Sequence, residues 1–246
     1  MSEISYTVDE GIATIRLAAP ERRNALSVEM SRELIDAART AESDAQVGAV
    51  IVSGGEHFCA GAVRSVLAET GRDPVEDAAY RNLETVYAAF TTIGSIDLPT
   101  IAAVRGAAVG AGLNLALATD LRVVSRTARL LPGFAQIGIH PGGGHLSLLH
   151  RVAGREAAAA MGLFGEEVDG ERAVDLGIAW SAHEDGQVEG AARVMAARAA
   201  ADPQLARRLV RNFRRETAPG GVPWDVAVEL ERSAQMWSLR RKHGAS

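Results

Sequence analysis

The sequence has little from which a disulfide framework, a zinc site or a membrane segment could be built. It contains one cysteine, Cys59, which excludes an internal disulfide, and its six histidines lack the spacing of a zinc site. The first residues show no basic stretch followed by an apolar one, and no apolar run is long enough to cross a bilayer. We therefore expect a cytoplasmic protein that binds no metal and does not insert into a membrane.

An excess of positive charge is also missing. The 26 basic and 31 acidic residues give a formal net charge of −5, so the chain offers no basic footprint for nucleic acid. Hydrophobic residues make up 47% of the chain and charged residues 23%, which is ordinary for a globular protein. A length of 246 residues suffices for one large domain, or for one domain with a small appendage.

Strand and helix patterns alternate over the first two-thirds of the chain, which predicts an α/β domain with parallel strands. Ser27 is a candidate N-cap for the first helix, and the β-branched run of residues 48–53 is typical of a fully buried strand. We predict strands over residues 4–8, 12–17, 48–53, 99–105, 120–125 and 177–180. We predict helices over residues 28–43, 77–93, 145–152, 156–164, 170–176, 186–201, 203–216 and 224–241.

The last third of the chain shows helical patterns only, which divides the sequence into two parts. Residues 1–185 are predicted to form an α/β core that contains any ligand site. Residues 186–246 are predicted to form a C-terminal helical region. Such a region either covers a site or builds an oligomer interface, and the sequence leaves both roles open.

Residues 99–125, PTIAAVRGAAVGAGLNLALATDLRVVS, carry the strongest local signal. A short buried strand is followed by Gly106, Gly110 and Gly112, and then by a helix that is apolar all round. A helix without a polar face lies in the core, and its glycine-rich start directs unpaired backbone N–H groups into the space before it. Such groups can stabilise a developing negative charge. The spacing matches neither the dinucleotide fingerprint nor the P-loop, and the alternative is a tight turn with close helix–strand packing.

Five segments follow one another in a characteristic order over nearly the whole chain. They are APERRNALS, GAVIVSGGEHFCAGAV, PTIAAVRGAAVGAGLNLALATDLRVVS, GIHPGGGHLSLLHRVAGREAA and ERAVDLGIAW. In these segments the chain resembles the crotonase (enoyl-CoA hydratase/isomerase) superfamily. The resemblance implies a spiral of ββα turns with a C-terminal helical region that mediates homotrimers or dimers of trimers. It also implies an acyl-CoA or enoyl-CoA thioester as the ligand, with coenzyme A as part of the substrate and no separate cofactor.

Two backbone N–H groups bind the thioester oxygen in that family. The resemblance places one of them on Ala62, directly after the substrate-binding pair Ala60 and Gly61. It places the other on Ala111, directly after Gly110. Ala111 begins the apolar helix, so the resemblance and the pattern of the residues point to the same anion site.

The resemblance also marks positions near coenzyme A. The loop of residues 22–25 matches positions at the adenine and phosphates, where Arg22 or Arg23 can pair with a phosphate and Ala25 adds to the lining. For each arginine the alternative is a solvated surface side chain. Val63 stands where the family often has an aspartate beside the substrate.

The two glutamates of the family's hydratases are absent. Asn114 and Phe134 occupy their positions, and neither side chain can donate or abstract a proton as a carboxylate does. Conventional enoyl-CoA hydration is therefore not expected. Asn114 is expected to position a water or a carbonyl group, and Phe134 to make this part of the pocket apolar.

Histidines are the remaining candidates for proton transfer. His140 and His145 flank the glycine loop of residues 141–144, and an imidazole titrates near neutral pH. The alternative is that His140 packs or caps and that His145 begins the next helix. Cys59 is interpreted as a small buried side chain rather than as a nucleophile.

Two functions remain open on the sequence. The first is an acyl-CoA hydratase, isomerase or hydrolase-like lyase that polarises the thioester through Ala62 and Ala111. The second is a catalytically silent acyl-CoA-binding protein with an intact pocket. The absence of both glutamates favours the second, and the positions of His140 and His145 favour the first.

Overall fold

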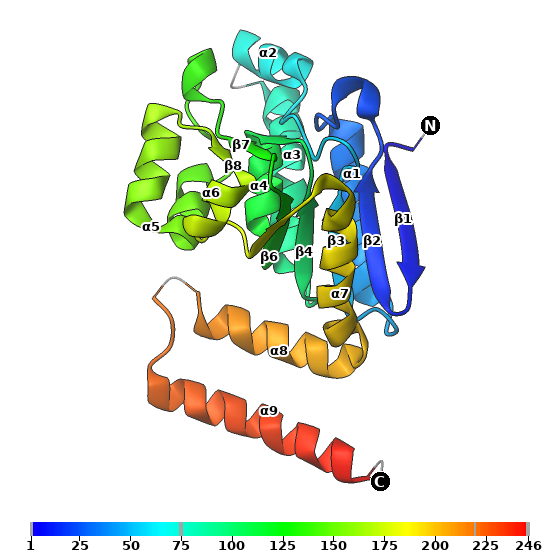
Figure 1. Ribbon diagram of the computed structural model, residues 1–246. Helices are drawn as coiled ribbons and strands as arrows, with labels where there is room; N and C mark the ends of the chain where they lie inside the picture. The colour runs from blue at the N-terminus through cyan, green and yellow to red at the C-terminus, as the bar shows by residue number, and fades with distance from the viewer. Residues whose placement is uncertain (1, 74–75, 219, 245–246) are drawn as a thin grey trace.

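The computed structural model describes residues 2–73, 76–218 and 220–244. Its larger sheet contains β1 (Ile4–Asp9), β2 (Ile12–Leu17), β3 (Ala49–Ser53), β4 (Thr100–Val104), β6 (Leu121–Ser125) and β9 (Ser181–His183). Within the described residues these strands lie in the order β1-β2-β3-β4-β6-β9 (Figure 1). β1 and β2 form an antiparallel hairpin, and each later pair of neighbours is parallel. The predicted α/β fold with parallel strands is confirmed.

A smaller sheet lies beside the first and contains β5 (Ala107–Val109), β7 (Arg129–Leu131) and β8 (Val168–Asp169). A long strand, a short strand and a helix recur along the chain. β4 and β5 lead to α4 (Ala111–Ala118), and β6 and β7 lead to α5 (His145–Phe164). The expected spiral of ββα turns is therefore confirmed.

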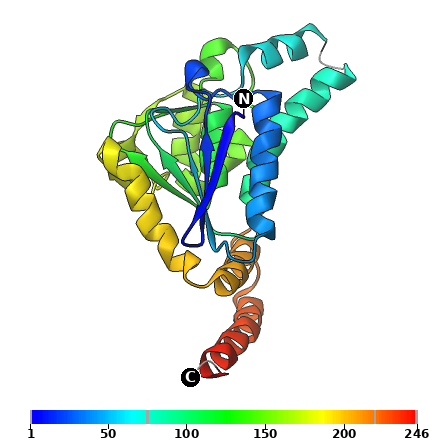
Figure 2. The same ribbon diagram turned by 90° about the vertical axis from the view of Figure 1, so that its right-hand side faces the viewer.

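Helices cover both faces of the larger sheet (Figure 2). α1 (Val28–Ser43), α3 (Asp77–Ser95) and α4 pack on one face, and α7 (Val188–Ala200) packs on the other. Phe90 belongs to the larger core on the first face, and Ala196 to the smaller core under α7. Both faces of the sheet are buried, which explains why its central strands are continuous apolar runs.

The remaining helices are α2 (Arg64–Arg72), α6 (Gly170–Asp175), α8 (Pro203–Glu216) and α9 (Trp224–Gly244), with short 3-10 turns at η1 (Pro20–Arg22), η2 (Ala135–Ile137) and η3 (Asp185–Gln187). α8 and α9 extend beyond one end of the sheet (Figure 1). Arg214 of α8 is tied to the core by an ion pair of 2.8 Å with Asp120. α7 shares a core with the sheet, and the boundary near residue 185 stays a prediction. None of the helices in the described ranges is long and apolar enough to span a membrane.

Most predicted elements are confirmed with small shifts at their ends. Ser27 caps α1 by accepting a hydrogen bond of 2.9 Å from the Met30 N–H. The two helices predicted over residues 145–164 form α5, which is kinked at Gly154. The strand predicted over residues 177–180 is wrong, because Gly177 (φ +73°) begins the turn that ends α6 and pairing starts only afterwards, in β9.

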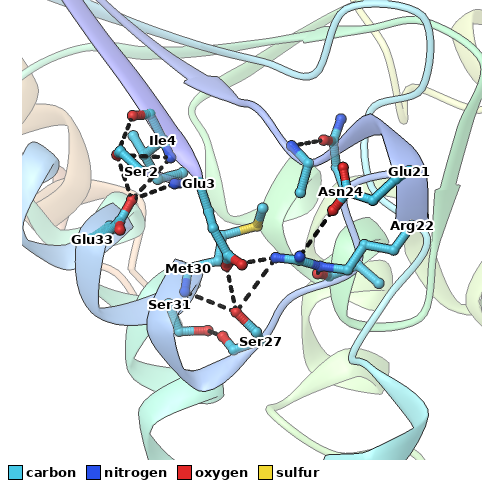
Figure 3. Close-up of polar contacts among 12 residues, drawn as sticks. Ser2, Glu3, Ile4, Glu21, Arg22, Asn24, Ser27, Met30, Ser31 and Glu33 are labelled. Atoms are coloured by element: carbon cyan, nitrogen blue, oxygen red, sulfur yellow. Dashed lines mark hydrogen bonds and ion pairs between the residues drawn. The ribbon is translucent and has the colours of Figure 1, made fainter.

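A buried asparagine holds two loops of this scaffold together. The Asn24 side chain accepts a hydrogen bond of 2.9 Å from the Ala19 N–H (Figure 3). Its amide nitrogen donates to the carbonyl oxygens of Gly54 at 2.8 Å and His57 at 2.6 Å. Asn24 also has φ +55°, a left-handed conformation that asparagine tolerates better than most residues. The side chain thus fixes the loop after β2 to the turn after β3, which leads to Ala62.

We predict that Asn24→Gly lowers the free energy of unfolding by about 2–4 kcal/mol, because one buried and two partly buried backbone groups lose their partner. Asn24→Ala should lower it further, since alanine adds strain at a positive φ that glycine avoids. Urea unfolding of the two variants and the wild type checks both effects. Equal stability of Asn24→Gly and the wild type would contradict the role of the side chain.

Candidate active site

A cavity of about 250 Å³ lies where the first turn of α4 meets the segment between β3 and α2. Seven of the residues singled out from the sequence line it together, namely Ala60, Gly61, Ala62, Gly110, Ala111, Asn114 and Phe134. They come from three separate parts of the chain. Apolar side chains such as Leu83 and Val86 of α3 form another part of the lining.

The backbone N–H groups of Ala62 and Ala111 belong to this lining. Ala111 is the first residue of α4, and the preceding Gly110 has φ +54°. Gly61, with φ +100°, lies in the segment between β3 and α2 that also contains Ala62. This segment passes close to α4, because a Cβ built on Gly61 would lie 3.9 Å from the Ala111 nitrogen. Neither N–H donates a hydrogen bond to another residue in the described part of the chain. The cavity therefore has two adjacent backbone donors available.

Close packing of α4 against Cys59 determines how near the start of this helix lies to the segment that carries Ala62. A Cβ on Gly112 would lie 2.3 Å from the carbonyl oxygen of Cys59, so only glycine allows the helix to come so near. Cys59 is completely buried, and its burial raises the pKa of the thiol to about 12. Since a thiol with this pKa stays protonated at neutral pH, Cys59 acts here as a packing residue.

Asn114 is held by two partners at the floor of the cavity. Its amide nitrogen donates to the Gly142 carbonyl oxygen at 3.1 Å, and its Oδ1 lies 2.6 Å from Nδ1 of His145. Because the Gly142 carbonyl can only accept, the amide orientation is fixed, and Nδ1 of His145 must carry the hydrogen. Asn114 therefore cannot rotate freely toward a ligand.

His145 lies behind Asn114 rather than in the cavity wall. The residue is 1% exposed, and its ring packs edge-to-face with the Phe134 ring at a centroid separation of 5.0 Å. Burial lowers the pKa of the imidazole to about 4. It is thus neutral at physiological pH. Within the described residues its Nε2 atom has no hydrogen-bond partner.

His140 takes a different position from His145. It is exposed, and its Nδ1 lies 2.7 Å from the carbonyl oxygen of Pro141. Its neighbours Ile139 and Gly142 line the cavity. The structure thus keeps His140 near the site but outside the set of lining residues, and its role in proton transfer stays a prediction.

The two arginines that the sequence could not tell apart have different surroundings. Arg22 pairs with Glu3 at 2.5 Å and donates to the Ala25 carbonyl oxygen at 2.9 Å (Figure 3). Arg23 is exposed and lines a second cavity of about 180 Å³ that shares Ala60 with the first. Its guanidinium has no ion-pair or hydrogen-bond partner among the described residues. Arg23 is thus the arginine available to an anionic ligand.

Val63 forms part of the framework. Its N–H donates to the Leu26 carbonyl oxygen at 3.0 Å, and the residue is the N-cap position of α2. Its side chain packs against the main core. Among the described residues, the preceding Ala62 belongs to the cavity lining and Val63 does not.

Tyr87 of α3 is a lining residue that the sequence analysis missed as a functional candidate. Burial raises the pKa of its hydroxyl, which therefore stays protonated at neutral pH. A Cβ on Gly142 would lie 2.0 Å from this hydroxyl, so Tyr87 touches the loop that also binds Asn114. The only signal in the sequence was an aromatic residue with a polar tip on the apolar face of a helix, which usually indicates core.

A spiral of ββα turns followed by a helical C-terminal region defines a crotonase-type fold. A sequence model of the enoyl-CoA hydratase/isomerase family matches residues 7–230. The chain belongs to this family, and as a member of it the protein is an enzyme of the crotonase type.

Relatives and solved structures agree with this assignment. The chain is 40% identical to a probable enoyl-CoA hydratase, EchA14, of Mycobacterium tuberculosis H37Rv, over 96% of this chain and 92% of that protein. It is 30% identical to the 1,2-epoxyphenylacetyl-CoA isomerase of Escherichia coli K12, over 96% of this chain and 89% of that protein. The crystal structure of an enoyl-CoA hydratase from Polaromonas sp. JS666 superposes with a TM-score of 0.88 at 27% identity, covering 98% and 93% of the two chains.

The buried imidazole predicts a pH dependence of stability. Below pH 6.5 the unfolded chain binds a proton that folded His145 takes up only near pH 4, so stability is complete above pH 6.5 and falls as the pH drops toward 4. The difference corresponds to about 3 kcal/mol. Urea unfolding between pH 4 and 7 should show a larger loss in the wild type than in His145→Gln, where only the carboxylates with lowered pKa values contribute.

The matched control is His140→Gln, which removes an exposed histidine from the same loop. This variant should keep the loss of stability seen in the wild type. If His145→Gln loses as much stability as the wild type over this pH range, the imidazole is not buried in its neutral form.

Proposed function

We propose that the protein binds an acyl-CoA thioester with its carbonyl oxygen between the N–H groups of Ala62 and Ala111. The observation that carries this proposal is the pair of adjacent backbone donors without a partner in the described chain, both at one cavity. The apolar lining, which includes Leu83 and Val86, suits an acyl chain. The two relatives described above carry the names of enzymes of CoA thioesters, which supports the same ligand class.

The two donors give the site its chemistry. A thioester carbonyl gains negative charge when an enolate forms at its α-carbon or when a nucleophile adds to the β-carbon of an enoyl group. Fixed N–H groups stabilise that charge without reorganisation, and one such donor is worth about 100- to 1,000-fold in rate. We therefore assign the protein to enzymes that proceed through a thioester enolate.

Hydration by a pair of glutamates is not part of this proposal. Asn114 and Phe134 stand at the two positions concerned, and the lining residues in the described ranges include no aspartate, glutamate or histidine. The amide of Asn114 is locked by Gly142 and His145, so it serves to position a ligand rather than to move a proton. Addition of water to crotonyl-CoA should be absent or very slow.

Coenzyme A itself is the only cofactor-like group in the proposal, and it enters as part of the substrate. Arg23 beside the second cavity is the candidate for its phosphates, because its guanidinium is free, whereas Arg22 would first have to leave Glu3. We also propose a homotrimer or a dimer of trimers. Exposed apolar side chains on α8 and α9, among them Phe213 and Trp224, support self-association.

The test of the donor pair is Ala111→Pro. Position 111 is the first residue of α4, where proline is tolerated, so the variant loses the N–H while keeping the helix. We expect turnover of any accepted thioester to fall about 100-fold or more. Ala111→Ser keeps the N–H and is the matched control.

The substrate is found by incubating the purified protein with a panel of acyl- and enoyl-CoA thioesters and measuring the mass and ultraviolet spectrum of the products. Binding of butyryl-CoA is measured by calorimetry in parallel. Binding without turnover of any thioester would support the acyl-CoA-binding alternative. Failure of every thioester to bind would overturn the proposed function.

A further inference from the structure

The cavity contains donors for an oxyanion but few groups that can move a proton. Among its lining side chains in the described ranges, two carry a titratable proton, Arg64 and Tyr87. Arg64 is exposed at the start of α2, and a guanidinium serves as a hydrogen-bond donor to anions rather than as a general acid. A proton delivered from the cavity wall must therefore come from the hydroxyl of Tyr87.

The position of Tyr87 fits this task. Its ring packs against Phe90 with centroids 5.8 Å apart, which fixes the side chain on α3. Its hydroxyl touches Gly142, whose carbonyl oxygen accepts the hydrogen bond of Asn114. Tyr87, Asn114 and Ala111 all line the same cavity.

The hydroxyl is also available. No residue in the described part of the chain forms a hydrogen bond with it, so a ligand can take that bond without breaking another. The burial that raises its pKa keeps it in the phenol form, which donates a proton but does not accept one. The cavity thus pairs an acid with an oxyanion site and has no carboxylate or imidazole base in its described lining.

We propose that the Tyr87 hydroxyl donates the proton that converts the bound thioester enolate into product. The inference rests on the proposed function, because the enolate is the species that Ala62 and Ala111 stabilise. The O–H bond of Tyr87 breaks as the new C–H bond forms at the α-carbon, and the enolate electron pair becomes that bond. Water entering through the open cavity then returns a proton to the phenolate.

A cavity lined by an acid but by no base in the described residues restricts how the enolate can form. Removal of an α-proton needs a base, whereas loss of carbon dioxide from a 2-carboxyacyl thioester leaves the same enolate and needs none. The carboxylate of such a thioester is destabilised among apolar side chains, and the departing carbon dioxide is uncharged. The substrate class is therefore a 2-carboxyacyl-CoA, which takes up one proton and yields carbon dioxide and the shortened acyl-CoA.

The experiment uses malonyl-CoA and 2-methylmalonyl-CoA with the wild type, Tyr87→Phe and Tyr80→Phe. Tyr87→Phe removes only the hydroxyl and keeps the ring contact with Phe90, while Tyr80 lies on the same helix but is 66% exposed. We expect decarboxylation by the wild type and by Tyr80→Phe. For Tyr87→Phe we expect kcat to fall about 100-fold with little change in KM, the loss typical of a missing general acid.

A second measurement uses the wild type alone and follows the stereochemistry of proton transfer. In deuterated water the wild type should convert 2-methylmalonyl-CoA into propionyl-CoA with one deuterium at C2 in a single configuration, because the hydroxyl delivers it from one face. A racemic product would overturn the inference. So would equal rates for Tyr87→Phe and the wild type.

Binding of butyryl-CoA and loss of carbon dioxide together distinguish an error in the role of Tyr87 from an error in the acyl-CoA site. If butyryl-CoA binds but neither carboxylated thioester loses carbon dioxide, the role of Tyr87 and the substrate class are wrong while the acyl-CoA site stands. If butyryl-CoA does not bind to the wild type, the acyl-CoA site itself is wrong, and the inference falls with it.

Discussion

The contact between the start of α4 and the chain after β3 is the constraint on which the site depends. Gly112 lets the helix touch the carbonyl of Cys59, and Gly61 lets its own segment pass close to the Ala111 nitrogen. A side chain at either position would force the two segments apart. The absence of a Cβ at these two glycines therefore allows the close approach of the segments that carry Ala62 and Ala111. The same contact buries α4 completely, which is why this helix has no polar face.

The glycine loop before α5 extends this tight packing to the other wall of the cavity. A Cβ on Gly142 would collide with the Tyr87 hydroxyl, and one on Gly143 would lie 2.4 Å from the Phe90 ring. The loop therefore lies directly on α3 and on Asn114. Packing of glycines against large side chains, together with the hydrogen bond between Asn114 and Gly142, holds the loop against this wall of the cavity.

The sequence predicted those features that depend on local pattern. Burial of α4, the Ser27 cap and the parallel strands follow from hydrophobic periodicity and capping chemistry, which act over a few residues. The contact of His145 with Asn114 joins residues 31 positions apart and leaves no mark in either segment. The difference between Arg22 and Arg23 could not be predicted for the same reason, since it depends on the distant Glu3, which directly precedes β1. Tyr87 looked like core because periodicity cannot tell a core-facing side chain from a cavity-facing one.

The replacement of carboxylates in this site also changes its electrostatics. A glutamate at position 114 would place a negative charge one turn from the Ala111 N–H, and that charge would oppose an enolate oxyanion in surroundings of low polarity. Asn114 and neutral His145 instead form a hydrogen-bonded pair without net charge. The partial positive charge at the start of α4 is then left unopposed by the side chains around it. In the proposed function, position 114 therefore carries no proton, and the uncharged pair favours negative charge on a ligand.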